Sequence, residues 1–214
     1  IIFHNLKCYD AHFVIKHFER KYAEHVNEKT GKVTIDDVNV IPLNTQKYLM
    51  FEVGKLRFLD SFQFLSTSLS SLTDMLYNNG AGKDNFVHTI KHFGSDDLLF
   101  AKGVYPYSYM DSLDRFAETK LPPRESFFNT LTEESLSEED YIRAEQTWTH
   151  FKIENMKQYH DHYLKLDVML LTDVFEHFRR TMYGKHKLDC LHYYTLPSYS
   201  WSAALRYTHA RSIS

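Results

Sequence analysis

The chain has 214 residues, of which 43% are hydrophobic and 15% aromatic. This is enough apolar material for a substantial core and argues against a disordered chain. The net charge of −3 gives no overall basic character of the kind that indicates nucleic-acid binding. Two cysteines without paired spacing argue against a disulfide framework and a cysteine zinc site.

No apolar run approaches the ~20 residues that span a bilayer, and no signal-peptide pattern is present. These observations predict an intracellular protein that is neither secreted nor bound to a membrane. The sequence lacks an initial methionine and opens directly on an apolar run. It is therefore expected to be a piece of a longer protein that begins within a domain.

The first half of the chain predicts a strand, a helix and then three strands. The strand covers residues 1–3, and apolar residues at helical spacing predict a helix from Asp10 to about Val26. Strands are predicted at 33–41, 47–53 and 56–61. Because only Gly54 and Lys55 separate the last two, they form a hairpin within an antiparallel part of the sheet.

The second half is predominantly helical. Helices are predicted at 68–77, 85–93, 137–151, 155–183 and 200–208. Between residues 103 and 123 the pattern is irregular and aromatic, which predicts a packed excursion without regular structure. The longest helix is expected to end at Gly184 and to bury one stripe of side chains. That stripe consists of Leu164, Val168, Leu171, Phe175 and Phe178.

Two short motifs carry the functional prediction. Asn5 and Tyr9-Asp10 follow the opening strand, so the carboxylate of Asp10 is expected where a strand ends and a helix begins. Tyr163 and Asp167 lie four residues apart in the longest helix, and their side chains therefore leave the same face about one turn apart.

Each motif also has a purely structural interpretation. Asp10 would serve equally well as the N-cap of the first helix, and Tyr163 with Asp167 as the edge of a buried stripe. The nearby His160-Asp161-His162 is better explained as an exposed polar face than as a metal site, because neighbours on a helix diverge in direction.

The two motifs together resemble the second and third exonuclease motifs of family B DNA polymerases, in particular the protein-primed branch. The resemblance extends through Leu59-Asp60-Ser61-Phe62, Tyr105-Pro106-Tyr107, Lys120-Leu121-Pro122-Pro123 and on to His192-Tyr193-Tyr194-Thr195-Leu196-Pro197. It implies an α/β fold of the ribonuclease H-like 3′–5′ exonuclease type, with a mixed sheet flanked by helices and its first strands missing. Residues 1–183 would form this domain, and residues 184–214 a connector and the first helix toward the polymerase palm.

The same resemblance implies roles for individual residues. Asp167 would bind one of two Mg²⁺ or Mn²⁺ ions directly, and Asp10 would hold its ion through water. Tyr163 would help to orient the attacking water, while Asn5 and Tyr9 would contact the 3′ end of single-stranded DNA. The first exonuclease motif, Asp-x-Glu, and the polymerase aspartates are not in this sequence, so the fragment by itself is expected to be inactive.

Two further elements of the branch have candidate positions. A Ser/Thr-Leu-x-x-hydrophobic element that binds single-stranded DNA and the priming protein fits either Ser61-Phe62-Gln63-Phe64-Leu65 or Ser68-Leu69-Ser70-Ser71-Leu72, and both remain open. A lysine used between the second and third motifs is assigned to Lys120.

The resulting prediction is a fragment of a DNA-directed DNA polymerase that contains most of its proofreading exonuclease domain. Its partners would be a single-stranded 3′ end, primer-template DNA, deoxynucleotides and a terminal priming protein, at the site of DNA replication in a nucleus or viral compartment. Two alternatives remain. One is a non-catalytic module, derived from such an exonuclease, that binds single-stranded DNA or protein, and the other is a stand-alone exonuclease.

Overall fold

The computed structural model describes residues 1–6, 13–16, 25–26, 33–34, 38–42 and 48–208. It divides into two compact units, one made of residues 1–67 and 178–214 and the other of residues 68–177. The boundary between them falls inside the longest helix. The first unit contains the described strands, and the second is built from helices and irregular segments.

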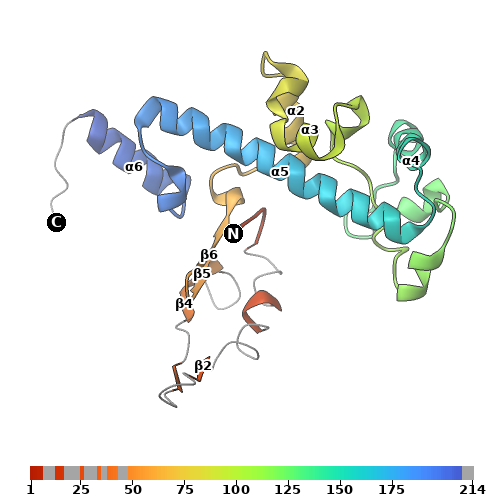
Figure 1. Ribbon diagram of the computed structural model, residues 1–214, viewed down its shortest axis with the longest axis horizontal. Coiled ribbons are helices and arrows are strands. Elements are labelled where there is room, and N and C mark those ends of the chain that lie inside the picture. The colour runs from red at the N-terminus through yellow and green to blue at the C-terminus, as the bar shows by residue number, and fades with distance from the viewer. Residues whose placement is uncertain (7–12, 17–24, 27–32, 35–37, 43–47, 209–214) are drawn as a thin grey trace. The chain divides into compact units, whose positions relative to one another are not determined.

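The larger sheet described in the first unit is mixed. Its four strands are β1 (Ile2–Phe3), β4 (Val38–Pro42), β5 (Tyr48–Val53) and β6 (Leu56–Asp60). They lie in the order β1-β6-β5-β4, with β1 parallel to β6 and the other pairs antiparallel (Figure 1). The predicted hairpin is confirmed, since β5 and β6 pair directly and Gly54 at the turn has a φ of 56°.

The predicted extent of the first helix is wrong at its C-terminal end. Residues 13–16 are helical, but β2 (His25–Val26) pairs antiparallel with β3 (Val33–Thr34). The prediction was based on the helical spacing of apolar residues. In the structure, the backbone N–H and C=O groups of His25 and Val26 are instead paired with β3.

Stacked aromatic side chains form the core against the sheet. Phe51 on β5 and Phe58 on β6 are buried, and their ring centroids lie 4.4 Å apart. Leu6 and Val53 belong to the same cluster. Alternation along the strands places Phe51, Val53 and Phe58 on one face, and Met50 and Leu59 on the opposite face are buried as well.

The C-terminal part of the first unit contains α6 (Leu196–Tyr207). The helix begins at Leu196, with Pro197 in its first turn, rather than at residue 200 as predicted. A proline is compatible with this position, because the first turn of a helix does not use its N–H. The hydroxyl of Thr195 caps the helix by accepting from Ser198 N–H at 3.3 Å.

The second unit contains three complete helices and the first part of a fourth. These are α2 (Leu69–Tyr77), α3 (Val87–Phe93), α4 (Glu138–His150) and the first part of α5 (Met156–His186) (Figure 1). Ser68 caps α2 and Ser137 caps α4, each by accepting an N–H three residues ahead. These boundaries confirm the helices predicted near residues 68–77 and 137–151. The segment 103–123 has no α-helix or strand and contains one short 3-10 turn, as predicted.

Within the described ranges, six 3-10 turns connect these elements. They are η1 (Ser61–Gln63), η2 (Gly82–Asn85), η3 (Asp97–Leu99), η4 (Leu113–Ala117), η5 (Arg124–Phe127) and η6 (Cys190–His192). No helix of the described residues is long and apolar enough to cross a membrane.

Two features of α5 differ from prediction. The helix passes through Gly184 and ends after His186, where Lys187 adopts a φ of 55° and donates its N–H to Tyr183 O at 2.8 Å. A single exposed glycine inside a helix costs only about 1 kcal/mol, so it need not end one. The predicted buried stripe is also misplaced, because Leu164 and Val168 are exposed.

A buried carboxylate fixes α3 against α5. Asp173 on α5 is 2% exposed and accepts hydrogen bonds from His88 N–H at 2.7 Å and Thr89 N–H at 2.9 Å. The Thr89 hydroxyl donates a third bond at 2.7 Å. An aspartate that caps the first turn of another helix both satisfies orphan N–H groups and sets the position of that helix.

Candidate active site

The buried face of α5 includes Tyr163 and places Asp167 beside it. Tyr159, Tyr163, Leu166 and Leu170 are all buried and recur every three or four residues, which is the period of one helix face. Tyr163 thus lies within this face rather than at its edge, contrary to the structural interpretation of the sequence.

Asp167 is a largely buried carboxylate with unused bonding capacity. Its side chain is 21% exposed, and Lys102 Nζ lies 3.8 Å from Oδ2. Oδ1 is buried and has no hydrogen-bond partner among the described residues. Burial raises the pKa of the Asp167 carboxyl, while the Lys102 ammonium and the Tyr163 hydroxyl offset part of the increase.

Residues 102–107, which we call the strap, run along this face of α5. A Cβ added to Gly103 would lie 3.2 Å from Tyr163 Cδ2, so the strap backbone touches the tyrosine ring. The Val104 carbonyl accepts from the Tyr159 hydroxyl at 2.8 Å. Glycine suits this contact, because a Cβ at this position would require the tyrosine ring to move by a few tenths of an ångström.

The aromatic side chains of the strap continue the contact with α5. The Tyr107 and Tyr163 hydroxyls lie 2.7 Å apart, and the Tyr105 hydroxyl lies 2.9 Å from His160 Nδ1. Burial raises the pKa of the Tyr163 hydroxyl well above its usual range, and Asp167 raises it further. The hydroxyl therefore stays protonated and can donate a hydrogen bond at any ordinary pH. Tyr107 is 67% exposed and offers an open aromatic face.

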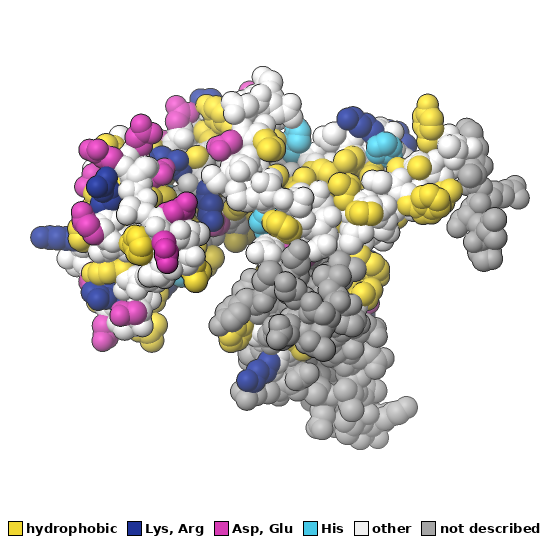
Figure 2. All heavy atoms as spheres, turned by 180° about the vertical axis from the view of Figure 1, so that it is seen from behind, with side chains coloured by type: hydrophobic (Ala, Val, Ile, Leu, Met, Phe, Trp, Pro, Cys, Tyr) yellow, Lys and Arg dark blue, Asp and Glu magenta, His cyan; other side chains and the backbone are white. Residues whose placement is uncertain are grey.

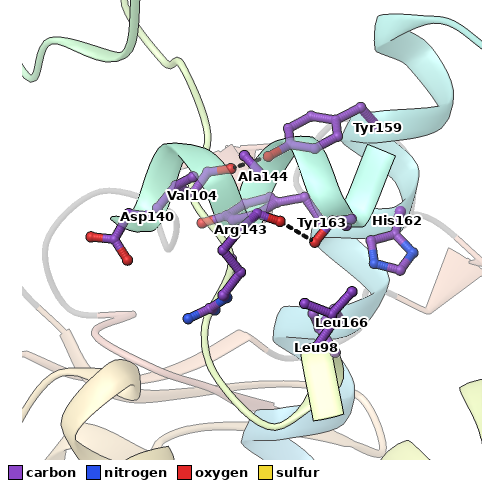
Figure 3. Close-up of a pocket in the computed structure, with 11 residues that line it drawn as sticks. Leu98, Val104, Asp140, Arg143, Ala144, Tyr159, His162, Tyr163 and Leu166 are labelled. Atoms are coloured by element: carbon purple, nitrogen blue, oxygen red, sulfur yellow. Dashed lines mark hydrogen bonds between the residues drawn. The ribbon is translucent and has the colours of Figure 1, made fainter. Parts of the chain in front are cut away.

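The cavity behind Tyr163 is too small for a substrate. Its volume is about 20 Å³, roughly that of one water molecule. Figure 3 shows Asp140, Arg143 and Ala144 of α4 beside Tyr159, His162, Tyr163 and Leu166 of α5, with Val104 hydrogen-bonded to Tyr159. A ligand would therefore have to approach Asp167 and Tyr107 from their solvent-exposed sides.

The residues of His160-Asp161-His162 do not form the exposed polar face expected from the sequence. His160 bonds to Tyr105 as described, and Asp161 pairs with the Lys157 ammonium at 2.6 Å. The ring of His162 packs between Phe151 and Phe93, at centroid distances of 4.4 and 5.3 Å. All three residues are therefore partly buried, and each has a separate structural role.

In the first unit, Asp60 joins two of the predicted DNA-binding segments. It is 1% exposed, and its Oδ1 accepts from Asn5 N–H at 2.7 Å and Phe62 N–H at 3.0 Å. Asn5 has a φ of 68°, a left-handed conformation that asparagine tolerates better than most residues. Since β1 and β6 are parallel, their adjacent ends bring Asn5 and Phe62 together.

The hydroxyls of the two candidate serines are both used within the protein. Ser61 is 1% exposed, and its Oγ donates to Phe3 O at 2.7 Å. Its Oγ also lies 3.0 Å from His4 Nδ1. Ser68 caps α2, and Leu69 beside it is buried. Leu65 is partly buried.

Several predicted residues are not brought together by the described structure. Tyr9 and Asp10 lie outside the described residues, so the expected convergence of Asp10 with Asp167 stays a prediction. Lys120 is exposed, and the lysine next to Asp167 is Lys102. A lysine directly before Gly103 and the aromatic strap was the sequence signal that could have identified it.

The metal site expected from the sequence stays a prediction. Within the described ranges, no group of three His, Cys, Asp or Glu side chains is placed to hold a metal ion. The unpartnered Oδ1 of Asp167 nevertheless fits a ligand of Mg²⁺ or Mn²⁺, since these ions bind carboxylate oxygens in preference to nitrogen or sulfur.

The visible surface around α4 is not a basic field. Figure 2 shows acidic side chains interspersed with lysines and arginines there. The first turn of α4 alone contributes Glu138, Glu139 and Asp140. This face therefore offers no extended basic surface.

Comparison with known proteins identifies the family of the chain. Residues 1–203 match the family described as DNA polymerase type B, organellar and viral. A probable DNA polymerase of Neurospora intermedia is 26% identical over 202 residues, which cover 93% of this chain and 18% of the relative. No solved structure matches the chain. Because the family model covers nearly the whole sequence, the chain belongs to the organellar and viral type B DNA polymerases.

Proposed function

We propose that this chain is most of the 3′–5′ proofreading exonuclease domain of a DNA-directed DNA polymerase, with a ribonuclease H-like fold. The observation that carries the proposal is the largely buried Asp167 carboxylate, whose Oδ1 has no partner among the described residues and which lies beside Tyr163 and Lys102. The mixed sheet with a parallel β1–β6 pair is compatible with the proposed fold.

The three side chains have complementary roles in phosphodiester hydrolysis. Asp167 supplies a carboxylate, and Lys102 supplies a positive charge that favours its ionised form and attracts a phosphate. The Tyr163 hydroxyl keeps its proton and would take part in the hydrogen bond that orients an attacking water. Asp167 and Asp10 would hold Mg²⁺ or Mn²⁺, Asp10 through water, and the bound ions would supply charge neutralisation and an activated hydroxide.

A single-stranded 3′ end would be gripped by aromatic stacking and backbone contacts. Tyr107 presents an exposed ring whose hydroxyl is fixed on Tyr163. Asp60 holds Asn5 together with Phe62 in the first unit, which supports the placement of the DNA-binding element at Ser61–Leu65 over the one at Ser68. Stacking on aromatic rings suits this task because it accepts any base sequence.

The remaining assignments follow from the proposed whole protein. Residues 1–183 would form the exonuclease domain and residues 184–214 the connection toward the palm. The polymerase would extend primer-template DNA with deoxynucleotides at the site of replication, starting from a terminal priming protein. Lys120 remains a proposed site lysine alongside Lys102.

The test is a comparison of excision and synthesis in the full polymerase that carries this chain. Asp167→Ala should reduce excision of a single-stranded 3′ end by about 100-fold or more while largely sparing nucleotide addition. Asp161→Ala is the matched control, because Asp161 lies on the same helix but pairs only with Lys157 among the described residues. Unchanged excision by Asp167→Ala would remove Asp167 from the active site.

A non-catalytic binding module would give a different result. Such a protein would bind single-stranded DNA with a strong salt dependence but show no Mg²⁺- or Mn²⁺-dependent excision above background. In that case Asp167→Ala would alter neither excision nor synthesis. The same assay therefore separates the two functions.

A further inference from the structure

We infer that Arg143, on α4, is a positioning residue that holds Lys102 beside Asp167. This inference rests on the proposed function, because it concerns the same site. Arg143 Nη2 donates to the Lys102 carbonyl oxygen at 2.5 Å. The bond connects α4 to Lys102, the first residue of the strap, which lies 41 residues before Arg143 in the chain.

The bond from Arg143 holds the one end of the strap that the contacts of Tyr159 and Tyr163 do not hold. The bond from Tyr159 fixes the carbonyl of Val104, and the ring of Tyr163 packs against Gly103. Among the residues that the structure describes, only Arg143 bonds to the backbone of Lys102. Its removal would leave that carbonyl without a partner and free the backbone from which the Lys102 side chain reaches Asp167.

The chemistry of Arg143 suits a positioning role. In the described part of the chain Arg143 forms no ion pair, so its guanidinium is directed to a backbone oxygen instead of to a carboxylate. Charge-assisted bonds to carbonyls are stronger than neutral ones. The backbone of α4 is fixed close by, since Ala144 is buried against Tyr159 and Met156 of α5. A rigid helix therefore presents the guanidinium to the strap.

The test measures excision kinetics in the full polymerase. Arg143→Met removes the donors but keeps an unbranched side chain, and it should lower kcat roughly tenfold with little change in KM, the loss expected for one charged hydrogen bond. Arg143→Lys keeps a donor and should retain most of the activity. Exposed Arg124, also in the second unit, provides the control variant Arg124→Met, which should behave like the wild type.

A double-mutant cycle separates positioning from general structural support. If Arg143 acts through Lys102, Lys102→Met combined with Arg143→Met should be no slower than Lys102→Met alone. The inference would be overturned if the two substitutions lowered kcat additively, or if Arg143→Met retained the wild-type kcat. If Lys102→Met alone still lowered kcat, the proposed site would remain supported in either case. Wild-type excision by Lys102→Met would instead refute the role of Lys102 and, with it, this inference. Should Arg143→Met not fold, the shorter Arg143→Gln would replace it in the same cycle.

Discussion

Acidification should destabilise the protein through His162. Burial lowers the pKa of the His162 imidazole from 6.5 to about 4, with a further contribution from Lys165. Its Nε2 is buried and unpartnered among the described residues, between the rings of Phe93 and Phe151. Between pH 6.5 and 4 the unfolded chain therefore binds more protons than the folded one, and the free energy of unfolding falls as the pH falls.

The size of the effect follows from the shift. A change of about 2.5 units at 1.36 kcal/mol each would give roughly 3 kcal/mol. Because the ring is not fully buried, solvent screening reduces this contribution to about 1–2 kcal/mol. The contribution is fully present above pH 6.5 and is lost as the pH falls through about 4.

Urea unfolding at a series of pH values between 7 and 4.5 would measure this contribution. His162→Phe removes the titrating ring and keeps an aromatic side chain, so its free energy of unfolding should fall less than that of the wild type as the pH decreases. The exposed His92 provides a control, and His92→Gln should retain the wild-type dependence. Equal pH dependence in His162→Phe and the wild type would refute the reasoning.

Three other substitutions test the strap and the hydrogen bonds by which Asp173 of α5 holds α3. Asp173→Ala should lower the free energy of unfolding by about 3–5 kcal/mol in urea titrations, because it leaves three donors unpaired, two of them buried; a loss below about 1 kcal/mol would contradict this role. Gly103→Ala should push the Tyr163 ring aside and cost about 1–3 kcal/mol in the same titrations, together with a measurable loss of excision, whereas wild-type values for both would show that the ring yields without consequence. Lys102→Met should raise the pKa of Asp167 further, and the acidic limb of an excision pH profile should then move to higher pH; an unmoved limb would dissociate the two groups.

Local sequence patterns correctly predicted the helices and the hairpin whose ends are stabilised by residues close by in the chain. Ser68 and Ser137 cap their helices, and Gly54 turns the hairpin, as their residue types indicate. Each outcome depends on bonds within a few residues of the chain. Sequence patterns capture such interactions well.

Features set by distant contacts were not predictable in the same way. The burial of Tyr163 depends on the strap, which covers a face of α5 that contains polar side chains. The strap residue Tyr107, whose hydroxyl contacts that of Tyr163, lies 56 residues earlier in the chain. Leu164 was expected to be buried because of its helical spacing with other apolar residues, yet it is exposed. Lys102 likewise lies beside Asp167 only because α5 and the strap run together.

The strap also indicates which sequence changes this region can tolerate. Two of its fixed atoms, the carbonyl oxygens of Lys102 and Val104, belong to the backbone, so the bonds to Arg143 and Tyr159 do not depend on the side chain at position 104. An inserted or deleted residue would instead move every later contact out of step with α5, including that of Tyr107. Relatives with this arrangement should therefore keep the length of the segment between Lys102 and Tyr107 constant, while position 104 should vary among apolar side chains that pack against Ala144 and Met156.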